Sequence, residues 1–428
     1  MTASCNAPRN LALLFPAACR RLPILAVCFF VIGGAAFSGG AKAQDGKKII
    51  RNTAPAHPPL TLKLEELWRA GGNAEGIMFG LPVEAIADDE GRVYLVDQQL
   101  CQVFVFGPDG GLERTLSRQG EGPGEVGIPV DIVKLPDGTF GLAEFFPGKL
   151  VKVTPEDIPA GEIVYDMSEE GVIGGITLQT MAEAVGEHLM IAGSRSVPKP
   201  NVLERSHFLA AVDPAGRQIL RYIEQVSEIE RPHSVVHEDD FLPCFSLANA
   251  MGPDGRVYAP SQREEYSISV FEPDGALVHL IERPDFEPWK RNDLDMRRIT
   301  ALFHAWAGGN PDTYPEFDLK DTERAITALH IDEKGQLWVQ HSRSNRDLPE
   351  GVFLNLDLYD AGGRWQREVQ LVCEGSPVSD GIRFLGDGRV LLIKGFVVAR
   401  LACLGSGLAT LGEDDTETLE IICYRLPT

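Results

Sequence analysis

The feature that most constrains the fold of this chain is a short motif that occurs six times. Each copy joins two apolar stretches through a turn of acidic residues and glycine, such as Asp137 and Gly138. The copies lie at 85–96, 135–142, around Gly186, 251–258, 331–338 and 385–392. Aspartate bonds back to the backbone and glycine accepts a positive φ, so each copy predicts a tight turn between two strands.

A second turn motif alternates with the first. Its copies lie at 103–110, 151–156, 210–216, 270–275 and 358–363. Between the turns, apolar and polar residues alternate with the period of two that is typical of strands. Each unit is therefore expected to hold four antiparallel strands, A to D. Four-stranded units that recur at roughly 45 residues are typical of β-propellers, and the sequence predicts an all-β protein with six blades.

The last unit lacks its fourth strand. Residues 419–424 read as its C strand, and the chain ends shortly after them. Residues 60–69 resemble the D strands of other units, so we expect this N-terminal strand to close the last blade and to remove an open edge. The propeller then covers residues 60–428, and residues 44–59 are predicted to be a flexible leader.

The first 43 residues have the order of charge and hydropathy of a secretory signal peptide. Arg20 and Arg21 precede an apolar stretch at 22–37, and a small-residue pattern ends at Ala43. The alternative is a membrane anchor, but 16 apolar residues fall short of the ~20 that a spanning helix needs. The sequence therefore predicts cleavage after Ala43 and export to the periplasm or the cell exterior. It predicts no membrane span in the mature form.

The charge argues against nucleic acid as a partner. The full chain carries −22, and removal of residues 1–43 takes away four basic residues and no acidic one, which leaves −26. Nucleic acids and anionic membranes are bound through lysine and arginine. We expect a monomer whose partner is a small molecule, a peptide or a protein. The five cysteines of the mature part are expected to be mostly free thiols, with a Cys403–Cys423 bridge as the alternative.

The repeated turns resemble those of NHL-type and related exported bacterial six-bladed propellers. Residues 120–125 resemble a Gly-x-Gly-Pro-Gly-Glu-aromatic motif that follows the first blade in exported members, although Val126 replaces the aromatic residue. The resemblance covers nearly the whole mature chain. It implies the fold, and it leaves the function open because such propellers include enzymes and binding modules.

The long connections are predicted to lie on one face. Strand direction alternates within a blade, so the B–C and D–A connections share a face and the A–B and C–D turns share the other. The long segments, which are 194–206, 225–243, 282–324, 341–350 and 400–416, are all of the first kind. Within 282–324, apolar residues recur at helical spacing from Leu294 to Trp306, which predicts a helix. Elaboration of one face marks it as the place of function.

Polar residues at the B–C corners and in the glycine-rich segment are the candidate ligand-binding residues. They are Asp97, Arg118, Glu121, Glu144, Arg195, Arg263, His341, Arg343 and Lys394, with Glu264 beside them. Mixed charges at the mouth of a channel are suited to a polar or anionic small molecule. The alternative is that these side chains pair with one another and fill the channel.

The sequence lacks the common catalytic signatures. No Gly-x-Ser-x-Gly motif occurs, and residues 120–125 lack the spacing of a phosphate-binding loop. His233 and His237 have the spacing of metal ligands on a helix, but Pro232 argues against a helix there, so no metal or other cofactor is predicted.

The leading hypothesis is a non-catalytic binding propeller that works through its elaborated face. The rival is a lactonase-like hydrolase or lyase with a divalent metal in the channel. A scaffold within a larger envelope complex is the third reading.

Overall fold

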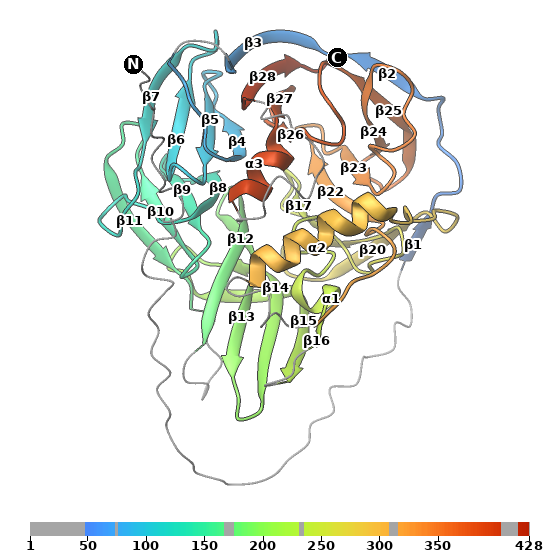
Figure 1. Ribbon diagram of the computed structural model, residues 1–428, viewed down its shortest axis with the longest axis horizontal. Helices are drawn as coiled ribbons and strands as arrows, with labels where there is room; N and C mark the ends of the chain where they lie inside the picture. Colours follow the sequence, from blue (N-terminus) through green and yellow to red (C-terminus); the bar gives the residue numbers. More distant parts are fainter. Residues whose placement is uncertain are drawn as a thin grey trace, which may run out of the picture. The chain divides into compact units, whose positions relative to one another are not determined.

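The computed structural model of the protein describes residues 48–72, 76–166, 175–230, 235–307, 316–403 and 418–427. The predicted signal peptide lies outside these residues. Apart from one separate pair of strands, the described strands form six sheets that are each built on four antiparallel strands, arranged around a common centre (Figure 1). The structure is therefore the six-bladed β-propeller that the repeats predict.

The first three blades follow one another along the chain. Blade one contains β4 (Pro82–Ala87), β5 (Val93–Asp97), β6 (Gln102–Phe106) and β7 (Leu112–Leu116). Blade two contains β8 (Pro129–Lys134), β9 (Phe140–Glu144), β10 (Lys149–Val153) and β11 (Pro159–Val164). Blade three contains β12 (Ile176–Val185), β13 (His188–Pro198), β14 (Val202–Val212) and β15 (Gln218–Glu230).

The other three blades include strands from both ends of the chain. Blade four contains β17 (Ala250–Met251), β18 (Val257–Pro260), β19 (Ser267–Phe271) and β20 (Leu277–Glu282). Blade five contains β22 (Ile326–Ile331), β23 (Leu337–His341), β24 (Val352–Tyr359) and β25 (Trp365–Val372). Blade six combines β26 (Gly381–Phe384), β27 (Arg389–Lys394) and β28 (Glu420–Arg425) with the N-terminal β3 (Glu65–Gly71).

An N-terminal strand closes the ring, but its bounds differ from the predicted 60–69. Strand β3 begins at Glu65, because residues 60–63 form a separate strand on another blade. The apolar core around β3 explains why this strand closes the ring. Trp68 of β3 stacks on Phe106 of blade one with ring centroids 5.4 Å apart. The side chains that join the two ends of the ring are therefore buried with those of blade one.

The predicted flexible leader is wrong for residues 48–59, while residues 44–47 lie outside the described chain. Strand β1 (Lys48–Arg51) pairs in parallel with β20, and β2 (Leu60–Lys63) pairs in parallel with β25. The outermost strand of a blade leaves backbone N–H and C=O groups without partners. In blades four and five, β1 and β2 of the N-terminal chain provide these partners. We call residues 48–63 the outer belt.

The outer belt is fixed where it crosses from blade four to blade five. The Asn52 side chain accepts a hydrogen bond from the backbone N–H of Trp365 at 2.9 Å. Its amide nitrogen donates to the carbonyl of Gly363 at 3.1 Å. Asn52 is buried, so one side chain satisfies backbone groups of blade five that would otherwise lack partners.

Six clusters of buried apolar side chains lie between the blades, one at each interface. Along β5, Tyr94 and Val96 belong to the cluster shared with blade two, whereas Val93 and Leu95 belong to the cluster shared with blade six. The two-residue period of a strand thus places alternate side chains in neighbouring interfaces. Every blade is held on both sides in this way.

The two faces of the ring differ. We call the face with the B–C and D–A connections the loop face and the opposite one the turn face. The connections of the loop face contain α1 (Glu238–Phe241), α2 (Asp293–Ala307), α3 (Phe396–Cys403) and a parallel pair of strands, β16 (Val235–His237) and β21 (Glu316–Asp318). Helix α2 lies in the insertion where apolar spacing predicts a helix, whereas α1 and α3 were not predicted.

The predicted loop at 194–206 is wrong. Strands β13 and β14 continue their antiparallel pairing as far as Pro198 and Leu203, so the connection is reduced to residues 199–201. In the added part of the ladder, the residues from Arg195 to Val197 and from Val202 to Ser206 are half-buried. No helix among the described residues is long and apolar enough to cross a membrane.

Candidate functional site

Two predicted acidic residues build the B–C corners of their blades. Asp97 ends β5 and is 0% exposed, and its carboxylate accepts three backbone N–H bonds at 2.7–2.9 Å. Glu144 ends β9 and accepts the N–H of Gly127 at 2.7 Å, while burial raises its pKa. In both blades the carboxylate ties the D–A connection to the corner.

The glycine-rich segment is a turn closed by its own glutamate. Glu125 accepts the backbone N–H of Gly122 at 2.9 Å and pairs with Arg118 at 2.8 Å. A Cβ on Gly120 would lie 1.9 Å from a carboxylate oxygen of Glu125, which explains the glycine. The Arg118 side chain is 79% exposed and Glu121 is exposed as well. These two predicted residues lie at the protein surface.

Arg263 belongs to a buried ion network on the loop face. It donates to Glu238 of α1 at 2.9 Å and to Asp239 at 3.0 Å. Arg291 donates two further hydrogen bonds to Glu238, at 2.7 and 2.8 Å, and pairs with Glu323 at 3.0 Å. Nearby, exposed Glu264 accepts the hydroxyl of Thr322 at 3.0 Å, a contact outside the buried network.

Glu238 stays ionised in this network despite its burial. Glu238 is only 1% exposed. Burial alone would raise the pKa of Glu238, but the hydrogen bond from Arg291 and the charge of Arg263 hold it below its ordinary value. Breaking such a buried pair costs ~3–5 kcal/mol. The network therefore fixes α1 and the 282–324 insertion to blade four.

His341 and Arg343 lie beside a second buried network, between blades four and five. His341 Nδ1 accepts the backbone N–H of Arg343 at 3.2 Å, and its Nε2 lies 3.7 Å from Asp357. Burial, together with the charge of Arg283, lowers the pKa of His341 to about 3, so its ring is neutral. Asp357 is fully buried, is paired with Arg283, and accepts the hydroxyl of Tyr266 at 2.7 Å. This network joins the two blades.

The remaining predicted residues lie in strands. Arg195 is half-buried in β13, opposite Thr177 and Ser206. Lys394 ends β27 and pairs with Glu374 at 2.9 Å. Among the described residues, a hydrogen bond joins two of the nine candidates, His341 and Arg343. Their role as ligand-binding residues stays a prediction.

The sequence interpretation missed charged side chains on the innermost strands. Glu84, Asp131 and Glu183 belong to β4, β8 and β12 of three consecutive blades. Asp131 accepts the backbone N–H of Ala182 at 2.9 Å, and Glu183 accepts that of Met251 at 2.8 Å. Both contacts reach the innermost strand of the next blade, whose inner edge has no strand partner.

Burial favours the neutral form of these innermost carboxyl groups. Burial, and then the charge of Glu84, raises the pKa of Asp131 well above its ordinary value. Burial raises the pKa of Glu183 to about 8. Burial raises the pKa of Glu84 as well, although Arg383 at 3.2 Å opposes the shift. In the sequence, a single acidic residue inside a short apolar stretch was the pattern that could have revealed each of these three residues.

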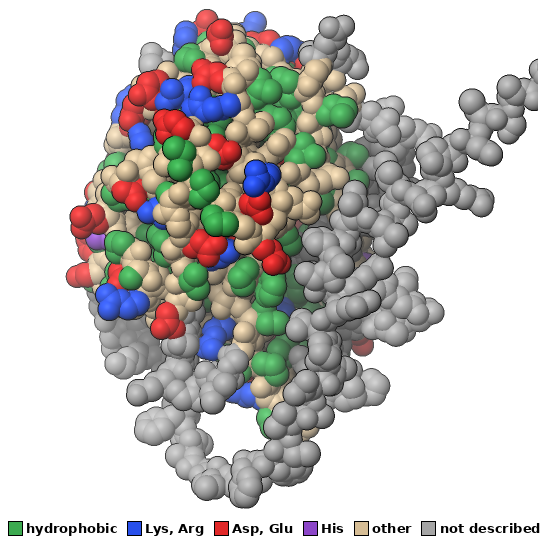
Figure 2. Space-filling model, turned by 90° about the vertical axis from the view of Figure 1, so that its left-hand side faces the viewer, with side chains coloured by type: hydrophobic (Ala, Val, Ile, Leu, Met, Phe, Trp, Pro, Cys, Tyr) green, Lys and Arg blue, Asp and Glu red, His purple; other side chains and the backbone are tan. Residues whose placement is uncertain are grey.

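Exposed apolar side chains gather on the connections of the loop face. Met78 is 85% exposed, and Leu100, Phe146, Leu247 and Val378 are exposed too. All five lie in B–C or D–A connections. In the described turns of the turn face, Ile158 is the comparable residue, and Leu112 and Ile219 are exposed at the strand starts that follow two of these turns. By contrast, the rim near blades one and two shows acidic and basic side chains intermixed (Figure 2).

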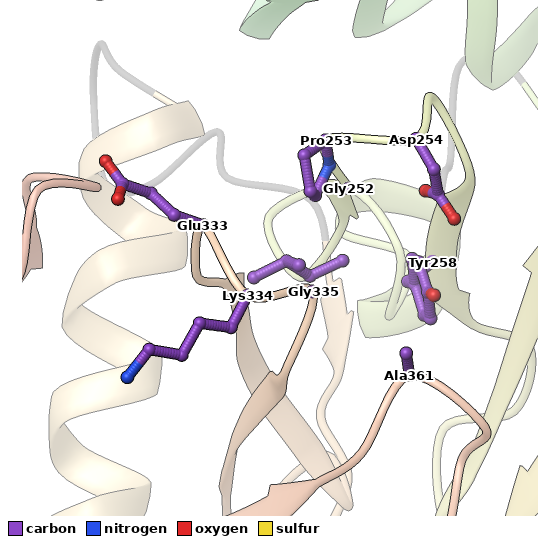
Figure 3. A pocket seen from close by; sticks show the side chains of 9 residues that line it. Gly252, Pro253, Asp254, Tyr258, Glu333, Lys334, Gly335 and Ala361 are labelled. Atoms are coloured by element: carbon purple, nitrogen blue, oxygen red, sulfur yellow. The ribbon is translucent and has the colours of Figure 1, made fainter.

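A shallow depression of about 200 Å³ lies on the turn face between blades four and five. It is lined by Gly252, Pro253, Asp254, Tyr258, Ile331, Glu333, Lys334, Gly335 and Ala361. The charged ends of Glu333 and Lys334 point away from Asp254 and Tyr258 (Figure 3). Charged groups from the two blades do not converge there, and we assign no ligand to it.

The described ranges contain neither a metal-binding group of side chains nor a disulfide. No group of three or more His, Cys, Asp or Glu side chains in them is arranged to hold a metal ion. His233 lies outside the described residues, and His237 pairs with Asp318 at 2.7 Å. All five cysteines among the described residues are free, including Cys403 and Cys423.

Comparison with known proteins finds similarity in structure only. No family model and no curated protein matches the chain, so the NHL relation stays a resemblance. A member of the DUF4221 family from Bacteroides vulgatus is 10% identical, with a TM-score of 0.45 over 86% of this chain and 99% of that chain. The calcium-binding protein regucalcin from Agrobacterium tumefaciens is 10% identical, with a TM-score of 0.41 over 86% and 96%. Virginiamycin B lyase from Staphylococcus aureus is 11% identical, with a TM-score of 0.40 over 86% and 100%. At this level of similarity none of them assigns an activity to this chain.

Proposed function

We propose that this chain is an exported binding module that engages a protein or peptide partner through its loop face. The observation that supports the proposal is the uneven distribution of exposed apolar side chains between the two faces. Five of them lie in connections of the loop face, against Ile158 alone in the described connections of the turn face. Exposed apolar side chains that gather on one surface are typical of interaction sites.

The loop face is also held rigidly, which favours binding. The Glu238 network fixes the long insertion to blade four, and the Asp357 network joins blades four and five beneath the same face. A rigid surface loses little conformational entropy when a partner docks. Large apolar side chains such as Phe146 and Met78 then serve as anchors that a partner covers.

Site-specific photo-crosslinking in the producing cell tests this proposal. We would place a photoreactive amino acid at Phe146, at Met78 and, as the matched control, at the exposed Ile158 of the turn face. We expect one discrete adduct from Phe146 and Met78 and none from Ile158. Adducts from all three positions, or from Ile158 alone, would contradict the assignment of the face.

Once the adduct is identified, a substitution measures the contribution of the anchor. Phe146→Asp should weaken the partner's affinity about tenfold or more, the loss expected for a central anchor. The melting temperature should stay the same because the side chain is exposed. Ile158→Asp should leave the affinity unchanged.

A further inference from the structure

Helix α3 lies over the centre of the ring. In Figure 1 it covers the middle of the six sheets, and it contacts α2. Phe396, Ala399 and Cys403 recur at helical spacing and pack against the core between blades one and two. This seat places one side of α3 against the core of the blades on the loop face.

Arg383 rises from the innermost strand of blade six toward this helix. Its Nε donates to the carbonyl of Val83 at 2.7 Å and lies 3.2 Å from Glu84. Both partners belong to the innermost strand of blade one, so the side chain crosses from one blade to the next. Its guanidinium lies over the Phe396 ring, 5.1 Å from the ring centroid.

A second guanidinium approaches the same ring from α3 itself. The Arg400 guanidinium lies 6.0 Å from the Phe396 centroid. Burial, and then the charge of Arg383, lowers the pKa of Arg400 below its ordinary value. Its side chain nevertheless keeps partial contact with solvent.

Arg400 differs from the other desolvated arginines of the loop face. Arg263 and Arg291 pair with Glu238, and Arg283 pairs with Asp357. Within the described part of the chain, Arg400 makes no ion pair or hydrogen bond, and the Phe396 ring is its partner. A desolvated cation beside another cation is costly unless an anion joins it.

We propose that Arg400 and Arg383 bind the oxyanion of a small ligand, a carboxylate or a phosphate, beside the Phe396 ring of α3. A guanidinium offers a planar pair of donors that matches such a group. The carboxyl groups of Glu84, Asp131 and Glu183 lie on the innermost strands, and burial raises their pKa values, so they repel such a group only weakly. Their polar atoms favour a ligand with one oxyanion and a polar remainder. It uses none of the exposed apolar residues and is independent of the proposed partner surface.

Thermal unfolding and calorimetry with simple probes test this site. Sodium acetate and inorganic phosphate are titrated against sodium chloride at equal ionic strength into three proteins: the native chain, Arg400→Gln, and Arg297→Gln. Arg297 is an exposed arginine of α2, so its variant controls for general salt effects on stability. We expect acetate or phosphate to raise the melting temperature of the native chain and of the control beyond chloride, and to lose this effect in Arg400→Gln. The probe that gives the effect identifies the class of oxyanion.

The ligand-free variants supply a second readout. Arg400→Gln removes one of two neighbouring charges, so its melting temperature without oxyanions should equal or exceed that of the native chain. Arg400→Lys keeps the charge without the planar donors and should weaken the oxyanion response about tenfold. An equal response in all variants, or no oxyanion response in the native chain, would overturn the proposal.

Discussion

At the scale of single residues, Gly110 shows how ring closure constrains the sequence. Gly110 lies in the C–D turn of blade one with φ +82°, and a Cβ there would lie 2.5 Å from the Trp68 side chain of β3. Gly138 has the same φ, but nothing lies within 4 Å of its Cβ position. Gly138→Ala should therefore cost ~1 kcal/mol of unfolding free energy for backbone strain alone, and Gly110→Ala ~3 kcal/mol because Trp68 must also move. Denaturant unfolding of both variants measures the difference, and equal losses would show that Trp68 adapts without cost.

Glu183 predicts a dependence of stability on pH. Its pKa is raised from an ordinary 4.5 to about 8 in the folded chain. The unfolded chain therefore loses this proton first, so the contribution of Glu183 is fully present below about pH 4.5. It falls as the pH rises through 8. Glu183→Gln keeps an acceptor for the N–H of Met251 and carries no proton to lose.

The measurement is the unfolding free energy of native chain and variant from pH 4.5 to 8.5. Relative to the native chain, Glu183→Gln should gain stability steadily across this interval. Glu187→Gln, at an exposed position of the same hairpin, is the control and should show a constant difference. A constant difference for Glu183→Gln would mean that its carboxyl group titrates normally.

At the scale of elements, the sequence predicted the structures that depend on residues close together in the chain. The tight turns and the α2 helix follow from turn chemistry and apolar spacing, and they were predicted. The outer belt was not, because β1 and β2 are four residues each with mostly exposed side chains. Their stability comes from pairing with β20 and β25, more than 200 residues away, and no local pattern records such a partner.

The candidate site also contains features that the sequence predicted and features that it did not. The loop face was predicted from the lengths of the connections, because length is visible in the sequence. The partners of Asp97 and Arg263 depend on how connections fold back onto the blades, so their burial was not predicted. Arg400 was overlooked because the segment from 400 reads as a loop, and only packing against two blades reveals α3 there.

At the scale of the whole molecule, six similar interfaces make the ring a single cooperative unit. Each blade shares one buried cluster with each neighbour. The interface between blades six and one depends on β3, which carries Trp68 and Ala70 into its core. The outer belt lies outside these interfaces, except that Leu62 packs against the cluster of blades five and six. The N-terminal chain thus combines a segment that supports the ring with one that closes it.

Two N-terminal truncations separate these contributions. A mature chain without residues 48–63 keeps four strands in every blade. It loses the belt pairing and backbone hydrogen bonds such as that from Asn52 to Glu282, each worth ~1 kcal/mol net. We expect it to fold, with a melting temperature lower by about 5–10 °C.

A chain without residues 48–71 also loses β3, which leaves β28 unpaired on one edge and the Trp68 core open. It should show no cooperative unfolding transition by calorimetry and should expose apolar surface to a hydrophobic dye. If both truncations melt cooperatively at similar temperatures, β3 does not close the ring, and the two ends of the chain contribute to stability only as parts of separate blades.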